Sequence, residues 1–219
     1  MKPAAIIFDL DGTLIDNNFY HIEAWKVFYK QHGLAFSMED YRNNINGKIN
    51  RDIFNYILGT TLSAEDLALY DSEKEALYRE LYAPHIEPVT GLMELLLHLN
   101  KEGIPMAVAT SGLPPNINFM FEHIPMRQYF GAVINASNIT HGKPHPEIFL
   151  KAAASHNAQP ELCIAFEDSV AGIRSAKAAG MKVIALVTTH KREELSEADY
   201  IINNYTEINL AEMKALLNQ

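Results

Sequence analysis

The chain has 219 residues, of which 48% are hydrophobic and 21% charged, so it can bury a sizeable core and does not resemble a disordered protein. Its formal net charge of −9 argues against a general nucleic-acid binder, because such binding needs clustered Lys and Arg to neutralise phosphates. The single cysteine, Cys163, excludes an intramolecular disulfide, and no apolar run approaches the ~20 residues needed to cross a bilayer. We expect a cytoplasmic protein without nucleic-acid or membrane partners, and a monomer, with an oligomer left open.

The first predicted element is a short apolar run that stops at two aspartates. Residues 4–8 are predicted to form a buried strand, and Asp9 and Asp11 follow it directly, before a turn at Gly12. Ligands bind at the carboxyl ends of strands in open α/β sheets. We therefore expect the beginning of the chain to carry catalytic residues.

The following block has helical patterns and no convincing strand pattern. Apolar residues recur at helical spacing from Phe19 until Gly33, and Ser63 and Asp66 resemble a capping arrangement at the start of a later helix. Further helices are predicted over residues 37–45, 51–58 and 63–82. We therefore predict that residues 17–84 form an inserted α-helical cap domain.

From Pro88 onward, helices and strands alternate. Strands are predicted over residues 105–109, 132–135, 162–166, 183–187 and 200–202, and helices over residues 92–99, 114–121, 146–156, 170–179 and 207–217. Repeated β-then-α units imply a parallel sheet with helices on both faces. We predict a doubly wound, Rossmann-like α/β core formed by residues 1–16 and 85–219.

Polar residues follow several of these strands, and Lys143 precedes the helix predicted over residues 146–156. Because parallel strands place their carboxyl ends on one edge of the sheet, these residues can share one crevice. The set comprises Asp9, Asp11, Thr110, Ser111, Lys143, Glu167 and Asp168.

The chemistry of this set suits phosphoryl transfer. Carboxylate oxygens are ligands that Mg²⁺ prefers, while a lysine and backbone amides suit phosphoryl oxygens. A carboxylate can itself accept the phosphoryl group, giving an aspartyl-phosphate. Asp9 comes first after the strand and is the better nucleophile; Asp11 can serve as general acid and base.

These residues also resemble a known superfamily. Phe8-Asp9-Leu10-Asp11-Gly12-Thr13, Thr110, Lys143-Pro144 and Glu167-Asp168 are similar to the four ordered motifs of the haloacid dehalogenase-like hydrolases, and the resemblance covers essentially the whole chain. It implies a Mg²⁺-dependent phosphoric monoester hydrolase. The dehalogenases themselves lack the second aspartate, so phosphate monoesters are the expected substrates.

The resemblance implies a role for each motif residue. Asp9 would be the nucleophile and Asp11 the acid and base, while Lys143 would neutralise the nucleophile and the phosphate. Thr110 and the Ser111 amide would hold the phosphoryl group. The metal ligands would be Asp9, the Asp11 carbonyl and Asp168, with Glu167 binding directly or through water.

A narrower similarity concerns β-phosphoglucomutases. Residues 20–25 are similar to a mutase segment whose histidine, here His21, helps control the acid/base aspartate and the substrate. Residues 46–51 lie where the mutase cap contacts sugar phosphate, which makes Gly47, Lys48 and Arg51 candidate substrate contacts. The register differs, because Asn46 stands where the mutases have lysine and Arg51 comes one residue later.

We therefore expect a phosphatase acting on a small phosphorylated metabolite, with a sugar or polyol phosphate as the leading candidate. Two alternatives remain open: a phosphosugar mutase, and a non-catalytic phosphate-binding module. Retention of the acidic and basic motif residues argues against the module. His141 and His145, on either side of Lys143, do not form a convincing zinc set by themselves.

Overall fold

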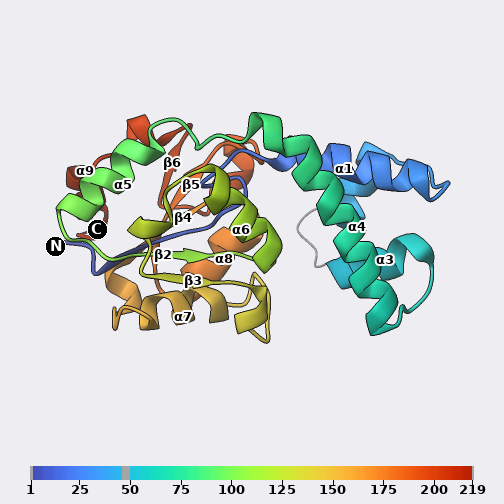
Figure 1. Cartoon of the computed structure of the whole chain (residues 1–219). Helices are drawn as coiled ribbons and strands as arrows, with labels where there is room; N and C mark the ends of the chain where they lie inside the picture. The colour runs from blue at the N-terminus through green and yellow to red at the C-terminus, as the bar shows by residue number, and fades with distance from the viewer. Residues whose placement is uncertain (1, 46–49, 219) are drawn as a thin grey trace. The chain divides into compact units, whose positions relative to one another are not determined.

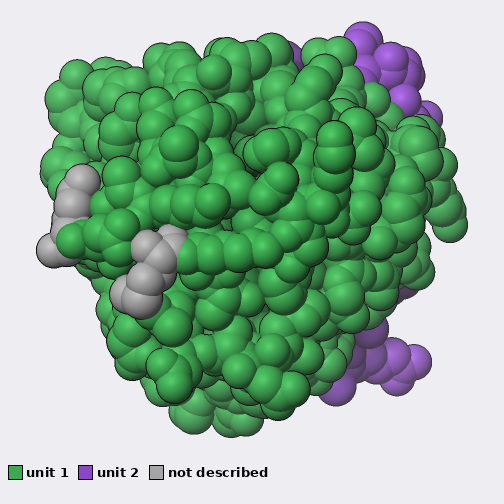
Figure 2. Space-filling view, turned by 90° about the vertical axis from the view of Figure 1, so that its left-hand side faces the viewer, with its two compact units in different colours: residues 1–16, 86–219 green, residues 17–85 purple. Residues whose placement is uncertain are grey.

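The protein, described here by a computed structural model over residues 2–45 and 50–218, divides into two compact units. Unit 1 comprises Met1–Asp16 and Ile86–Gln219, and unit 2 comprises Asn17–His85. Figure 1 labels most of the helices and strands of both units, and Figure 2 distinguishes the units by colour. Unit 2 is thus an insertion into the chain of unit 1 shortly after the first strand.

Unit 1 is built on a parallel sheet. Its strands are β1 (Ala5–Phe8), β2 (Met106–Ala109), β3 (Ala132–Ile134), β4 (Cys163–Glu167), β5 (Lys182–Leu186) and β6 (Tyr200–Ile202). Their order is β3-β2-β1-β4-β5-β6, and each neighbouring pair is parallel. All residues of β1, β2 and β4 are buried, as expected for strands covered on both faces. The predicted α/β fold class is confirmed.

The sheet order positions the functional edge. Ile7 pairs with Ala107 of β2 on one side and with Ala165 of β4 on the other. After β1 the chain adds β2 and β3 in one direction and then returns to add β4 beside β1. The strand order therefore reverses between β1 and β4, and in open α/β sheets ligands bind at this point, beyond the carboxyl ends of the strands.

Helices and short 3-10 segments cover both faces of the sheet. Ile7 and Ala165 belong to a buried cluster that also contains Phe149 and Ile173, from α7 and α8. The next residues along the two strands point to the other face. There Phe8 stacks on Phe166 with ring centroids 4.9 Å apart. The helices of unit 1 are α5 (Leu92–Lys101), α6 (Pro114–His123), α7 (Glu147–Ala154), α8 (Val170–Ala178) and α9 (Leu210–Leu216).

The last helix begins later than predicted. Residues 205–207 form a separate 3-10 turn, and α9 starts only at Leu210. The Asn209 side chain accepts hydrogen bonds from the amides of Ala211 and Glu212 and so caps the helix. The predicted start at Glu207 was wrong because an asparagine cap, rather than the first acidic residue, sets this boundary.

The regular secondary structure in the described residues of unit 2 is all helical, with loops over residues 32–37 and 59–63. Its helices are α1 (Asn18–Gln31), α2 (Met38–Asp40), α3 (Asn50–Leu58) and α4 (Ala64–Tyr82). Trp25, Phe28 and Phe54 form the buried centre where α1 and α3 meet. At the start of α4, the Ser63 hydroxyl accepts the amide of Asp66 at 3.1 Å, which is the predicted capping contact. Among the described residues, no helix has both the length and the apolarity required to cross a membrane.

Candidate active site

Asp9 occupies the first position beyond β1. Its amide donates to the Phe166 carbonyl of β4 at 2.9 Å, so the sheet continues to hold the backbone past the last strand residue. The residue is 6% exposed. Its Oδ1 accepts a hydrogen bond from the Lys143 ammonium at 2.6 Å. Asp9 and Lys143, predicted from separate motifs, are therefore in direct contact.

Glu167, the last residue of β4, holds Lys143 from the other side. Its Oε1 lies 2.5 Å from Lys143 Nζ, and the residue is completely buried. Its Oε2 accepts the amides of Asp168 and Ser169 and the Ser169 hydroxyl, each at 2.9 Å. One carboxylate thus fixes both the lysine and the turn that leads into α8.

Asp168 lies against the turn that follows β1. It is 4% exposed, and the Thr13 hydroxyl donates to its Oδ1 at 3.4 Å. Gly12 has a φ of +73°, and a Cβ at this position would lie 2.1 Å from Asp168 Oδ2. Glycine is therefore needed here both for its backbone conformation and for the close approach of Asp168.

Asp11 and Thr110 lie near each other at the β2 end of the same edge. A Cβ on Gly112 would lie 3.1 Å from the Thr110 hydroxyl and 3.5 Å from Asp11 Oδ2. Thr110 is completely buried, and its hydroxyl accepts the Gly112 amide at 2.9 Å. The neighbouring Ser111 is exposed. Unit 1 therefore brings the predicted acid/base aspartate and phosphate-binding threonine together.

The electrostatics of this edge are dominated by buried negative charge. Burial, together with the charges of Glu167 and Asp11, raises the pKa of Asp9 to about 8, although Lys143 opposes the shift. Burial, Glu167 and Asp9 also raise the pKa of Asp168 well above its usual range. Burial alone would lower the pKa of Lys143, but Asp9 and Glu167 outweigh it and hold that pKa above its ordinary value. Three buried carboxylates thus share one ammonium, an arrangement that favours an additional cation.

Comparison with known proteins identifies the family. The family model described as haloacid dehalogenase-like hydrolase matches residues 6–186. The chain belongs to this family. Validoxylamine A 7'-phosphate phosphatase from Streptomyces hygroscopicus subsp. limoneus is 31% identical over 202 residues, which cover 92% of this chain and 94% of the relative. Hexitol phosphatase A from Escherichia coli K12 is 32% identical over 213 residues, covering 95% and 94%.

A solved structure extends this similarity to the whole fold. The β-phosphoglucomutase from Clostridium difficile matches with a TM-score of 0.85 and 25% identity, covering 99% of this chain and 97% of that one. The predicted resemblance to the haloacid dehalogenase-like hydrolases and to their β-phosphoglucomutase-like branch is confirmed. The predicted enzyme class, a phosphoric monoester hydrolase, agrees with the phosphatases among these relatives.

The remaining predicted residues of this haloacid dehalogenase-like chain belong to unit 2. His21 lies in α1, where its Nδ1 is 2.9 Å from Lys74 Nζ and its ring stacks on Tyr78 with centroids 3.9 Å apart. Arg51 is exposed on α3 and pairs with Asp52 at 3.1 Å. Gly47 and Lys48 lie outside the described residues. His21 is therefore a fixed side chain, whereas Arg51 is a surface cation.

Sequence patterns missed two groups. Thr189 follows β5, and its hydroxyl hydrogen-bonds to Asp168, which lowers the pKa of that carboxyl against the stronger effect of burial. The rule that polar residues follow a strand would have found Thr189. Lys74, which contacts His21, is only 3% exposed although its helix has an ordinary mixture of charges. No local pattern distinguishes such a buried lysine from a surface one.

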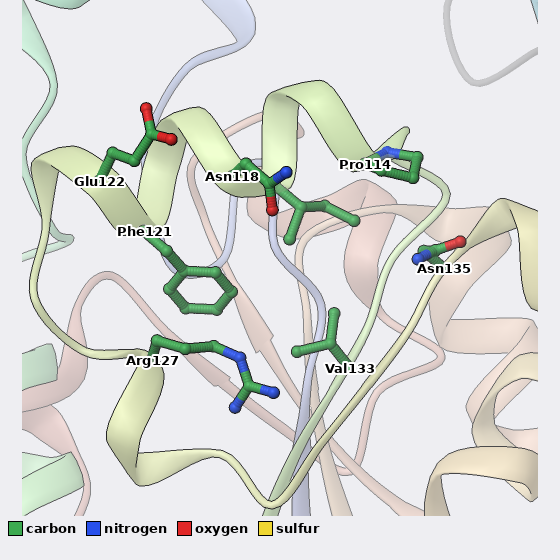
Figure 3. Close-up of a pocket in the computed structure, with 8 residues that line it drawn as sticks. Pro114, Asn118, Phe121, Glu122, Arg127, Val133 and Asn135 are labelled. Atoms are coloured by element: carbon green, nitrogen blue, oxygen red, sulfur yellow. The ribbon is translucent and has the colours of Figure 1, made fainter.

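A separate cavity of about 500 Å³ lies between α6 and the β3 edge of unit 1. Figure 3 shows Phe121 and Arg127 among its walls. The Arg127 guanidinium is already engaged, since it lies over the Phe121 ring and donates to the Phe130 carbonyl. None of the predicted site residues lines this cavity, so it is distinct from the carboxylate cluster.

Proposed function

We propose that the chain is a Mg²⁺-dependent phosphatase that hydrolyses a small sugar or polyol phosphate through an aspartyl-phosphate on Asp9. The observation that carries the proposal is the contact of buried Asp9 with Lys143. Two further buried carboxylates, Glu167 and Asp168, belong to the same cluster, and Glu167 also contacts Lys143. The hexitol and validoxylamine phosphatases support the substrate class.

In the first step, Asp9 attacks phosphorus. Lys143 donates a hydrogen bond to Oδ1, so Oδ2 is the oxygen that attacks. A bond forms between this oxygen and phosphorus while the ester P–O bond breaks. Asp11 gives a proton to the departing alcohol oxygen, which makes the alcohol a better leaving group. The products are the free alcohol and phospho-Asp9.

In the second step, Asp11 takes a proton from water as the water oxygen attacks the phosphorus of phospho-Asp9. The bond between Asp9 and phosphorus then breaks, which releases inorganic phosphate and restores the carboxylate. Asp11 thus returns to its protonated state for the next cycle.

Thr110 and Lys143 would hold the phosphoryl oxygens during both steps. The Thr110 hydroxyl accepts the Gly112 amide, so its own proton is available for donation to a phosphoryl oxygen. The Ser111 amide would add a second donor. Lys143 provides a fixed positive charge because Glu167 and Asp9 position its ammonium. Such prepositioned charges need no reorganisation when the phosphoryl group transfers.

The donor set also fits a divalent cation. Asp9 and Asp168 supply buried carboxylate oxygens, and the excess of negative charge over the single ammonium needs compensation. We propose that these two carboxylates and the Asp11 carbonyl hold Mg²⁺, which would neutralise charge on the phosphoryl oxygens. Both Glu167 oxygens already accept donors from Lys143, Asp168 and Ser169. Glu167 therefore positions Lys143 and would reach the metal only through water.

Metal removal gives a direct prediction. We expect EDTA to abolish phosphate release and added Mg²⁺ to restore it. Without a cation, the negative charges of Asp9 and Asp168 would repel the negatively charged phosphate group. Asp168→Asn should raise the Mg²⁺ concentration for half-maximal activity by at least about tenfold. Phosphate release measured over a Mg²⁺ titration tests both statements. Full activity of the EDTA-treated protein would contradict the metal assignment.

We propose that unit 2 acts as the cap that selects the leaving group. The chain leaves unit 1 after Asp16 and re-enters it at Ile86, where Pro88 forms a bridge with Ile15, a few residues after Asp9 and Asp11. Caps of this kind exclude bulk water while chemistry proceeds and open for product release. His21, Gly47, Lys48 and Arg51 are the candidate substrate contacts of this unit.

A phosphosugar mutase is the second candidate, and one observation favours it. His21, the residue through which the sequence resembles the mutases, is held by Lys74 and Tyr78. A histidine fixed in this way has a defined orientation. The altered register of residues 46–51 and the phosphatases among the relatives favour hydrolysis instead.

A product assay separates the two activities. With β-glucose 1-phosphate and a bisphosphate primer, we expect inorganic phosphate to exceed glucose 6-phosphate at least about tenfold, because the phosphoryl group on Asp9 goes to water. Both products are measured in the same reaction, with Asp9→Asn as the blank. Predominant formation of glucose 6-phosphate would replace the phosphatase proposal with the mutase.

A further inference from the structure

Three metal-ligating side chains gather on the segment that carries Lys143. His141, His145 and Glu147 each offer one ligand atom, and these atoms all lie within 4.8 Å of one another. The two histidines alone were not expected to form a zinc set. The structure adds Glu147, the first residue of α7, as a third member.

The distance between two of the ligand atoms matches the distance between ligand atoms around a bound zinc ion. His141 Nδ1 lies 3.3 Å from Glu147 Oε2, and the two imidazole rings have centroids 4.5 Å apart. Two ligands on a tetrahedral Zn²⁺ with bonds near 2.1 Å are about 3.4 Å apart. The His141–Glu147 pair therefore already has this separation, and the ligand atom of His145 lies within 4.8 Å of both.

The surrounding contacts hold these ligands in place. The Glu147 carboxylate accepts the amides of Thr140 and His141 and pairs with Lys151 at 2.8 Å, which closes the loop onto the start of α7. The Ser175 hydroxyl of α8 donates to the His145 carbonyl at 2.7 Å. Outer contacts of this kind orient metal ligands in proteins.

The group is also accessible. The His141 side chain is 62% exposed and that of Glu147 is 17% exposed. An incoming ion therefore meets two imidazoles at the surface and one carboxylate behind them. Three protein ligands leave at least one coordination position for water, as in open zinc sites.

We propose that His141, His145 and Glu147 form a binding site for a transition-metal ion such as Zn²⁺, separate from the carboxylate cluster around Asp9. Imidazole nitrogen suits Zn²⁺, Cu²⁺ and Ni²⁺, whereas Mg²⁺ prefers oxygen ligands. Excess Mg²⁺ should therefore occupy the carboxylate cluster and leave the histidine site to zinc. This inference goes beyond the proposed phosphatase activity and is independent of it.

Calorimetric titration with Zn²⁺ in excess Mg²⁺ tests the site on the full chain. We expect one zinc ion to bind wild-type protein, and His141→Ala or His145→Ala to weaken its binding at least about tenfold. His98→Ala is the matched control, because His98 is an exposed histidine of α5, and it should bind zinc like wild type. Asp168→Asn should also leave zinc binding unchanged. Circular dichroism confirms that each variant is folded.

Co²⁺ absorption provides a second measurement that does not depend on activity. We expect a d–d band on addition of Co²⁺ to wild-type protein and its loss in His145→Ala. Equal zinc affinity of wild type and both histidine variants would overturn the proposal. Loss of zinc binding in Asp168→Asn would do so as well, since it would place the ion at the carboxylate cluster.

Discussion

Replacement of Asp9 by asparagine is expected to lower kcat for phosphate-ester hydrolysis by at least about 10⁴-fold, the scale seen when a catalytic nucleophile is removed. Asparagine has nearly the same size and its amide oxygen can still accept a hydrogen bond from Lys143, but the amide cannot take up the phosphoryl group to form an acyl phosphate. Phosphate release in saturating Mg²⁺ measures the effect. Asp66→Asn, at an exposed position in α4, is the matched control and should retain wild-type kcat.

The covalent intermediate gives a second measurement of the same prediction. Wild-type protein quenched with acid during turnover should gain the mass of one phosphoryl group on the peptide that contains Asp9. The Asp9→Asn variant should not gain it. Wild-type activity of the variant with Mg²⁺ would show that the nucleophile is another residue. A wild-type chain that turns over no member of a broad phosphate-ester panel would instead favour a non-catalytic phosphate-binding module.

The central strands of the sheet were predictable because β1, β2 and β4 are buried on both faces. β1 is a continuous apolar run, and β4 is apolar up to its last residue, Glu167, so neither strand shows the polar alternation of a half-exposed strand. The polar residues that follow them then identified Asp9 and Asp168. The helix starts were less predictable, because a polar side chain near a helix start has more than one possible partner.

Asn17 illustrates this limit. It precedes α1, where an asparagine would ordinarily cap the helix, yet its side chain makes no cap hydrogen bond. Instead its Nδ2 donates to the Tyr78 hydroxyl at 2.7 Å, 61 residues along the chain. The same limit applies to the contact between Lys143 and Asp9, which are 134 residues apart. The family motifs predict that Asp9 and Lys143 lie in one site, whereas local sequence patterns predict neither of these contacts.

Gly172 is a case that no motif or local pattern revealed. It lies in α8, where alanine would ordinarily stabilise a helix by about 1 kcal/mol. A Cβ at this position, however, would lie 1.7 Å from Glu167 Oε1 and 1.9 Å from its Cδ. The helix therefore approaches the Glu167 carboxylate as closely as a glycine allows.

We expect Gly172→Ala to destabilise the fold by about 3 kcal/mol, at the upper end of the usual cost of overpacking. Glu167 cannot retreat without giving up its bonds to Lys143 and to the start of α8. Displacement of Lys143 should also lower kcat about 10²-fold. Chemical unfolding followed by circular dichroism measures the stability, since fluorescence of the single tryptophan, Trp25, reports unit 2.

A double-mutant cycle tests whether contact with Glu167 is the cause. Glu167→Ala removes the side chain that the new Cβ would strike, so adding Gly172→Ala to it should cost almost nothing further, and the two effects should be strongly non-additive. Gly142→Ala is the matched control: no atom lies within 4 Å of the added Cβ, and stability should change by less than about 0.5 kcal/mol. Simple additivity of Glu167→Ala and Gly172→Ala would mean that the glycine is needed for a reason other than its close approach to Glu167.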